Sequence, residues 1–407
     1  MPRIPTAVLS LAAGLTLLAS ACTGPSNRMA EDAPEPSTSR LVGTAATTTP
    51  ASELRSELSY LLEEHVQLVG LATRTAIVSK PGAAEVAAVV ATHDVNALAL
   101  SKVIGRSYPT LESPLLASWR QHLSFFLDYA RAKAAGSGRA VAQARSDLDG
   151  FRTSFGLLIN SVVPTLPADA VTAELKPHVD ALLETIDAQV GGDRRQFALL
   201  RTAAGHMQST AALLAGGIAS DLKLSKTETP AADLRSGLTA LLTQHVYSLA
   251  MAVDTALAKG GNLQDPLVTG SLDALDGTTI ALSKALGSAY PAVQKPFAQS
   301  WRQHVGFVLD YALAKADGSL PRAAASRKDI DGYRADFGQL INSVVVDLPA
   351  SAVAAELTPF VTDLLVAIDA DVEGRADAVS KLRAAATRMP KTAGTLAGAI
   401  AEDKKLA

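Results

Sequence analysis

The stretch DLDGFRTSFGLLINSVV at residues 147–163 returns as DIDGYRADFGQLINSVV at residues 329–345. The offset between matching residues is 180 before residues 260–265 and 182 after them, so one two-residue insertion accounts for the change. A period this long favours two copies of one domain over a solenoid of short repeats. Two shorter matches precede this stretch in the same order in both copies: LRSELSYLLEEHV (54–66) with LRSGLTALLTQHV (234–246), and SKVIGRSYP (101–109) with SKALGSAYP (283–291).

The pattern within each copy is helical. Apolar residues recur at steps of three and four, and alternating β-branched runs are missing. Ser113-Pro114 predicts the start of the third helix, Asp193 to Gln196 predicts a capping box, and Pro177 is expected to kink or restart the fifth helix. The sequence therefore predicts an all-α protein with two tandem homologous helical bundles of about six helices each. In the first copy the predicted helices are 50–78, 84–105, 114–135, 139–162, 168–190 and 194–221.

The first 21 residues have the features of a secretory signal. Arg3 supplies a positive charge, an apolar run too short for an ordinary membrane span follows, and small residues precede Cys22. Cys22 is the single cysteine, so it cannot form an internal disulfide. LLASAC resembles the lipobox of bacterial lipoproteins, although Ala19 stands where Leu is usual. This resemblance implies that Cys22 is lipidated and becomes the mature N-terminus.

Four segments follow from these patterns: a lipoprotein signal peptide (1–21), a spacer (22–49), bundle copy one (50–224) and bundle copy two (231–407). The spacer is rich in Pro, Ser and Thr and lacks an apolar period, so it is expected to stay disordered. We expect an extracytoplasmic protein that is anchored to the cell membrane by lipid, or secreted if it is not lipidated.

The charge balance argues against nucleic acid as a partner. Lys+Arg 37 is matched by Asp+Glu 40, and the formal net charge is −3. Binding to phosphates needs a clustered basic surface. A membrane and a protein of the cell envelope are the partners that the sequence leaves open.

All five histidines of copy one lie on apolar stripes of predicted helices: His65, His93, His122, His178 and His206. A single neutral imidazole in a core needs partners for its N–H and its lone pair. Five of them in one bundle favour a shared ligand, because one metal ion or haem iron satisfies several imidazoles together.

Within copy one we favour His65, His122 and His206 as ligands, with Glu64, Asp94 or Met207 as additional ones. Copy two keeps His245 and His304, whereas Leu275, Phe360 and Arg388 match the other three histidines. Either both copies hold a two-histidine site, or copy one holds a full site and copy two holds only a vestigial one. Copper, iron, zinc and haem all remain open as the cofactor. Ligand histidines must be unprotonated, so binding is expected to weaken as the pH falls through about 6.5.

The motifs of common active sites are missing from the sequence. No E-x-x-H or H-E-x-x-H pair, G-x-S-x-G elbow, P-loop or G-x-G-x-x-G turn occurs. No reaction is assigned for this reason.

LLxEHV on the first helix and W-x-x-H within SWRQHxxFxLDYA on the third carry a resemblance that covers both copies. They are similar to a group of secreted or lipid-anchored tandem helical-bundle proteins of Gram-positive bacteria, some of which are labelled copper amine oxidase-like. The label itself implies a metal, but that enzyme family is β-rich and forms its quinone from a Tyr preceded by Asn. No Asn precedes a Tyr in this chain.

The sequence thus favours a membrane-anchored helical-bundle lipoprotein that binds a transition metal or haem through inward histidines. The alternative is a non-catalytic interaction or structural module of the cell envelope whose histidines are core residues.

Overall fold

The computed structural model describes residues 46–80 and 82–407. These residues form α-helices and one short 3-10 helix, with no strand among them, which confirms the all-α prediction. The first half contains α1 (Pro50–Val78), α2 (Ala84–Gly105), α3 (Pro109–Ala134), α4 (Gly138–Asn160), α5 (Ala168–Val190) and α6 (Gln196–Asp221). The second half contains α7 (Pro230–Ala258), α8 (Pro266–Ala289), η1 (Pro291–Val293), α9 (Gln294–Ala316), α10 (Leu320–Asn342), α11 (Ala350–Val372), α12 (Ala378–Ala386) and α13 (Met389–Asp403).

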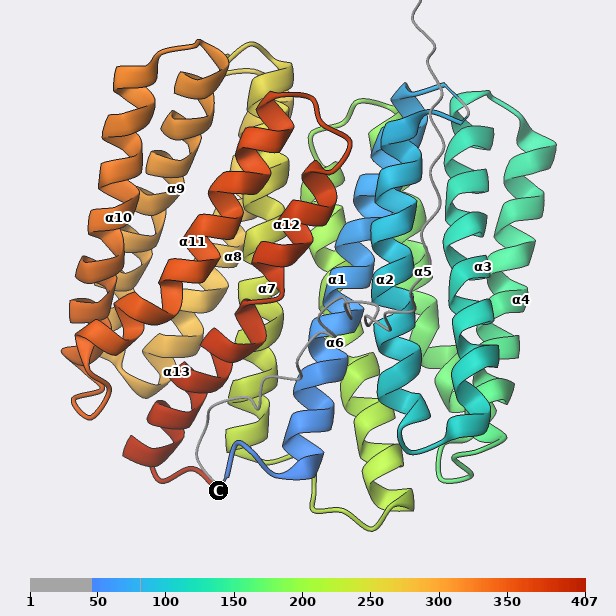
Figure 1. The fold of residues 1–407 in the computed structure, drawn as a ribbon. Coiled ribbons are helices and arrows are strands. Elements are labelled where there is room, and N and C mark those ends of the chain that lie inside the picture. The colour runs from blue at the N-terminus through green and yellow to red at the C-terminus, as the bar shows by residue number, and fades with distance from the viewer. Residues whose placement is uncertain (1–45, 81) are drawn as a thin grey trace, which may run out of the picture. The chain divides into compact units, whose positions relative to one another are not determined.

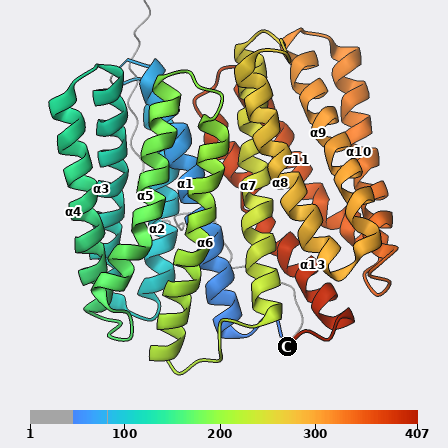
Figure 2. The same cartoon turned by 180° about the vertical axis from the view of Figure 1, so that it is seen from behind.

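The first helix of each half lies at the centre of the fold. Helix α1 packs against α2, α3, α5 and α6 of its own half and against α7 of the other half (Figures 1 and 2). Almost every residue from Leu58 to Gly70 is buried, including the polar Glu63, Glu64 and His65. A helix that is buried on all sides must pair each of its polar side chains with a partner. The polar groups of α1 are therefore the first place to look for function.

The two halves meet in a reciprocal way. Arg55 on α1 donates from Nη1 to the Thr227 carbonyl at 2.9 Å, and Arg235, which is its counterpart in the repeat, donates to the Thr47 carbonyl. Thr47 and Thr227 are also counterparts, so each arginine reaches the segment that precedes the other half's first helix. Both halves belong to one compact unit. Whether either bundle folds on its own stays a prediction.

The third helix begins earlier than predicted. It starts at Pro109, which occupies the first turn, and Pro114 lies inside the helix. Pro177 also lies inside an unbroken α5, so the expected restart there does not occur. Helix α5 is packed between α4 and α6, and these tertiary contacts outweigh the one backbone hydrogen bond that a proline removes.

The sixth helix begins at a different residue than predicted, and its counterpart in the second half is interrupted. It begins at Gln196, because Asp193 accepts a hydrogen bond from the Arg195 N–H in a tight turn in place of forming a capping box. In the second half the corresponding helix is interrupted between α12 and α13. Pro390 lies at the start of α13, where the first half has Gln208. A proline there has no N–H to donate to the carbonyl of Ala386, the last residue of α12.

Two helices, α2 and α11, are long and apolar enough to cross a membrane by length and composition. Both pack within the bundles, and buried core helices pass the same test. The predicted signal peptide, Cys22 and nearly all of the spacer lie outside the described residues.

Candidate metal centre

Three histidines from three different helices meet in the core of the first half. His65 comes from α1, His122 from α3 and His178 from α5. Each offers one ring nitrogen, and these nitrogens all lie within 4.8 Å of one another. None of the three side chains is more than 1% exposed. Three neutral imidazoles converging on one point form a ligand set typical of zinc, copper and iron sites.

His93 on α2 contacts the outer ring nitrogen of His65. Its Nε2 lies 2.8 Å from Nδ1 of His65, which leaves Nε2 of His65 for the centre of the cluster. A metal-binding histidine is usually oriented in this way, by a partner on its second ring nitrogen. His93 thus acts as the partner of a ligand.

Several buried ring nitrogens of the cluster lack a hydrogen-bond partner. They are Nε2 of His65, Nδ1 of His122 and both ring nitrogens of His178. An unpaired polar atom in a core costs about 1–3 kcal/mol, and a native structure holds only a few of them per 100 residues. Their concentration around one point fits a site for a bound ion.

Aromatic side chains enclose the cluster. The ring of Phe151 stacks on His122 with 4.0 Å between centroids, and the ring centroids of Trp119 and His65 lie 4.7 Å apart. Phe126 contacts His122 edge-on at 4.7 Å between centroids. Close packing on these sides argues against a group as large as a porphyrin. Of the proposed cofactors, a single transition-metal ion fits better than haem.

The electrostatics keep the histidines neutral. Burial is the main cause that lowers the pKa of His65 and of His122 well below the usual value, and nearby histidines lower both further. Burial also lowers the pKa of His93 and of His178 to about 4. All four imidazoles are therefore unprotonated at neutral pH, as metal ligands must be. Proton competition is shifted down from the pH of about 6.5 that the sequence led us to expect.

Some residues predicted as ligands lie elsewhere. His206 is only half-buried on α6 and is not part of the group of three, in which His178 takes the place we had expected for it. Asp94 makes a two-pronged ion pair with Arg120 at the surface, with one contact at 2.9 Å, so its carboxylate is not available. Met207 is fully buried on α6, and its role as a ligand stays a prediction.

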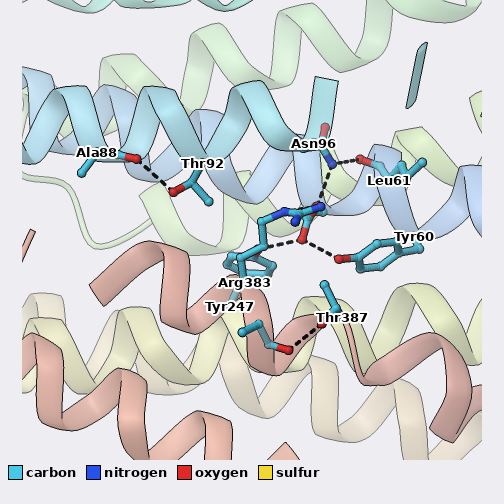
Figure 3. Close-up of polar contacts among 10 residues, drawn as sticks. Tyr60, Leu61, Ala88, Thr92, Asn96, Tyr247, Arg383 and Thr387 are labelled. Atoms are coloured by element: carbon cyan, nitrogen blue, oxygen red, sulfur yellow. Dashed lines mark hydrogen bonds and ion pairs between the residues drawn. The ribbon is translucent and has the colours of Figure 1, made fainter. Parts of the chain in front are cut away.

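Glu64 is buried but faces away from the cluster, because neighbouring residues on a helix point in directions about 100° apart. Its carboxylate accepts hydrogen bonds from the hydroxyls of Tyr60 at 2.7 Å and Tyr247 at 3.0 Å. It also accepts from Asn96 at 2.9 Å and from the Arg383 guanidinium at 3.1 Å (Figure 3). With four donors from α1, α2, α7 and α12, Glu64 links the two halves and has little capacity left for a metal.

The second half uses its two histidines differently. Nε1 of Trp301 donates to Nδ1 of His245 at 3.1 Å, and Nε2 of His245 lies 3.0 Å from Nε2 of His304. An indole N–H can only donate, so Nδ1 of His245 is the acceptor and its Nε2 carries the proton toward His304. Both nitrogens of His245 are thereby satisfied. Burial lowers the pKa of His304 to about 3.

The sequence identified the histidine-rich helices but not which histidines meet. Leu200, Ala203, Ala204 and Met207 form the buried stripe of α6, and His206 lies beside that stripe. The sequence placed His178 on an apolar stripe but not among the three favoured ligands, and the structure shows it on the buried face of a continuous helix. The one available signal was that Leu175, His178 and Leu182 keep a helical spacing across the proline.

Comparison with known proteins finds no matching family model, no matching curated protein and no matching solved structure. The likeness to tandem helical-bundle lipoproteins therefore stays a prediction.

Proposed function

We propose that the first bundle binds one transition-metal ion through His65, His122 and His178, with His93 orienting His65. The observation that carries this proposal is the meeting of three buried imidazoles, each with at least one ring nitrogen that lacks a hydrogen-bond partner. No carboxylate or cysteine belongs to the described group, so the ion would be held by nitrogen alone. Imidazole ligands suit copper, zinc, iron and nickel better than magnesium or calcium.

The closed geometry favours holding the ion over turning over a substrate. All three ligands are buried, and aromatic rings pack against them. Three protein ligands leave one position of a tetrahedral ion open, as in catalytic zinc sites, but the burial of all three histidines argues against access by a substrate. We therefore assign a binding role to this centre and no reaction.

The test is metal analysis of the purified protein, followed by titration of the metal-free protein with Zn²⁺ and with copper. We expect about one ion per chain. His178→Phe installs the residue that the second half carries at the equivalent position, so the fold should tolerate it. This variant should bind at least about tenfold to a hundredfold more weakly, since it removes a direct ligand.

The matched control is His206→Arg, which also installs the second half's residue but lies outside the group of three. It should bind as the parent does. If the parent binds no ion, or if the two variants bind equally well, the histidines of the first half are core residues.

We also propose that the protein is exported and anchored at Cys22. This proposal is supported by the positive charge at Arg3, the apolar run that follows and the LLASAC sequence. Stable attachment to a membrane takes more than one acyl chain or a second membrane signal, and a lipidated N-terminal cysteine supplies several chains.

Membrane fractionation and the mass of the mature N-terminus test the anchor. The parent should remain with the membrane and carry lipid mass, whereas Cys22→Ala should lose both. Identical partitioning of the two proteins, with no lipid on the parent, would rule the anchor out.

A further inference from the structure

Residues of α7, α8 and α13 line a groove in the second half, and none of the histidines belongs to its lining. Figure 2 shows these three helices in the second half. The volume of the groove is about 560 Å³, which lies within the range of small-molecule sites of about 300–1,000 Å³. The wall is largely apolar, and Asp233 and Lys404 lie at the rim. The apolar lining residues include Leu234, Leu238, Leu241, Ala285, Ile400 and Leu406.

The repeat shows how the same place differs in the first half. At the equivalent place in the first half, Glu57 and Arg106 form an ion pair at 2.6 Å that spans α1 and α2. Their counterparts are Gly237 and Ser288, which both line the groove. A Cβ added at Gly237 would meet no atom within 4 Å, so space is open there. The second half has lost the two side chains that cover this position.

A third difference sets the charge of the rim. Lys404 stands where the first half has Leu222, while the acidic residue is kept as Asp233 in place of Glu53. Relative to the first half, this place loses one acidic and one basic side chain and gains a lysine. Across these three positions the charge changes from neutral to +1, and Asp233, which also lines the groove, is already paired with Arg55. Lys404 is therefore the lining side chain that can bind an anionic group.

Lys404 can turn toward a ligand, because Asp403, its present partner, would still accept a hydrogen bond from Tyr290. Its Nζ lies 2.9 Å from Asp403 and 4.0 Å from the ring centroid of Tyr290. Asp403 also accepts a hydrogen bond from the Tyr290 hydroxyl at 2.7 Å. That bond has a counterpart of the same length between Tyr108 and Asp221, where no lysine is present.

We propose that this groove binds a single-chain aliphatic carboxylate. The chain lies against the leucines of α7 and Ile400, and the carboxylate pairs with Lys404. Burial of an aliphatic chain supplies most of the affinity at roughly 25 cal/mol per Å² of apolar surface, and the ion pair selects the head group. This site is independent of the metal proposed for the first half.

The test is calorimetric titration of the mature full-length protein with laurate below its micellar concentration. We expect one site per chain. Restoring the first half's ion pair with Gly237→Glu and Ser288→Arg should close the groove and weaken binding at least about tenfold. Lys404→Leu should weaken laurate about fivefold and leave dodecanol unchanged.

A second variant, which places the second half's residues in the first half, tests whether weaker binding could come from misfolding. Glu57→Gly, Arg106→Ser and Leu222→Lys should open a second groove in the first half and raise the stoichiometry from one laurate to two. Circular dichroism should show an unchanged helical fold in both variants. Equal laurate binding by the parent and the closed variant, or equal affinity of the parent for laurate and dodecyltrimethylammonium, would overturn the proposal.

Discussion

The first bundle gathers four histidines, whereas the second bundle joins its two histidines to Trp301 in a hydrogen-bonded chain. The scaffold is the same in both, and His65 and His122 match His245 and His304. The difference comes from the neighbours. Leu275 in place of His93 leaves Nδ1 of His245 to Trp301, and Phe360 replaces His178.

This comparison separates a structural role from a binding role. In the second bundle the protein itself satisfies both ring nitrogens of His245, and Nδ1 of His304 is the one unpaired ring nitrogen of the two histidines. In the first bundle Trp119 has no partner for its Nε1, and ring nitrogens of three histidines are unpaired. The first bundle therefore leaves unpaired the indole N–H that the second bundle pairs with a histidine, and it leaves more ring nitrogens unpaired. Such a local departure from good packing is typical of a functional site.

At neutral pH the largest effect on stability is expected at Glu64, which the second bundle replaces with Gln244. Glu64→Gln leaves the Arg383 guanidinium, only 16% exposed, without its carboxylate. Breaking a buried ion pair from one side costs about 3–5 kcal/mol, so the free energy of unfolding should fall by about 3 kcal/mol. Urea denaturation with unchanged slope measures this loss.

Glu57→Gln is the matched control, because it breaks a more exposed ion pair with Arg106. An exposed pair contributes about 0–1 kcal/mol. If both variants lost the same stability, Glu64 would not link the bundles in the way that its four donors indicate.

The next effect is the response of the metal-free protein to acid. The pKa of His93 and of His178 is lowered to about 4 in the folded state, so the unfolded chain binds more protons between pH 6.5 and 4. Their stabilising contribution is fully present above about pH 6.5 and is lost as the pH falls toward 4. At 1.36 kcal/mol per pKa unit, each histidine accounts for about 3 kcal/mol across that range.

The double variant His93→Leu with His178→Phe removes both groups and installs the second bundle's residues. Its stability should fall less steeply between pH 6.5 and 4 than that of the parent. Glu63 and Asp371 act in the opposite direction, because burial raises the pKa of each to about 7. Both carboxyls remain in the variant, so the difference between the two unfolding curves isolates the histidines. Parallel curves would contradict the buried neutral state.

Metal binding should follow the same lowered pKa values. Affinity should hold at pH 6, where free histidine is already largely protonated, and should weaken only as the pH approaches about 4. Titration with Zn²⁺ at pH 7, 6 and 5 measures this. A tenfold loss between pH 7 and 6 would mean that the ligands are exposed imidazoles elsewhere in the chain.

The fold was largely predictable from the sequence, because the helical period and the duplication extend over hundreds of residues. The starts of α3 at Pro109 and of α6 at Gln196 were not predictable, since several nearby residues could have begun each helix. The group of histidines was only partly predictable. A shift of one position on α6 separates the buried Met207 from the half-buried His206, and only the packed bundle fixes that rotation.

The smallest effect compares the two tryptophans, which occupy equivalent positions in the SWRQH repeats. Trp301→Phe removes the N–H that His245 accepts, whereas Trp119→Phe removes an N–H without a partner. Both changes remove the same atoms from a buried site, so their packing costs should be similar. The lost hydrogen bond should make Trp301→Phe the more destabilising of the two by about 1 kcal/mol. Urea unfolding of the two variants in metal-free buffer measures the difference. Equal losses would mean that His245 and His65 are in the same state, and the contrast between a satisfied and an unsatisfied bundle would then fail at its simplest point.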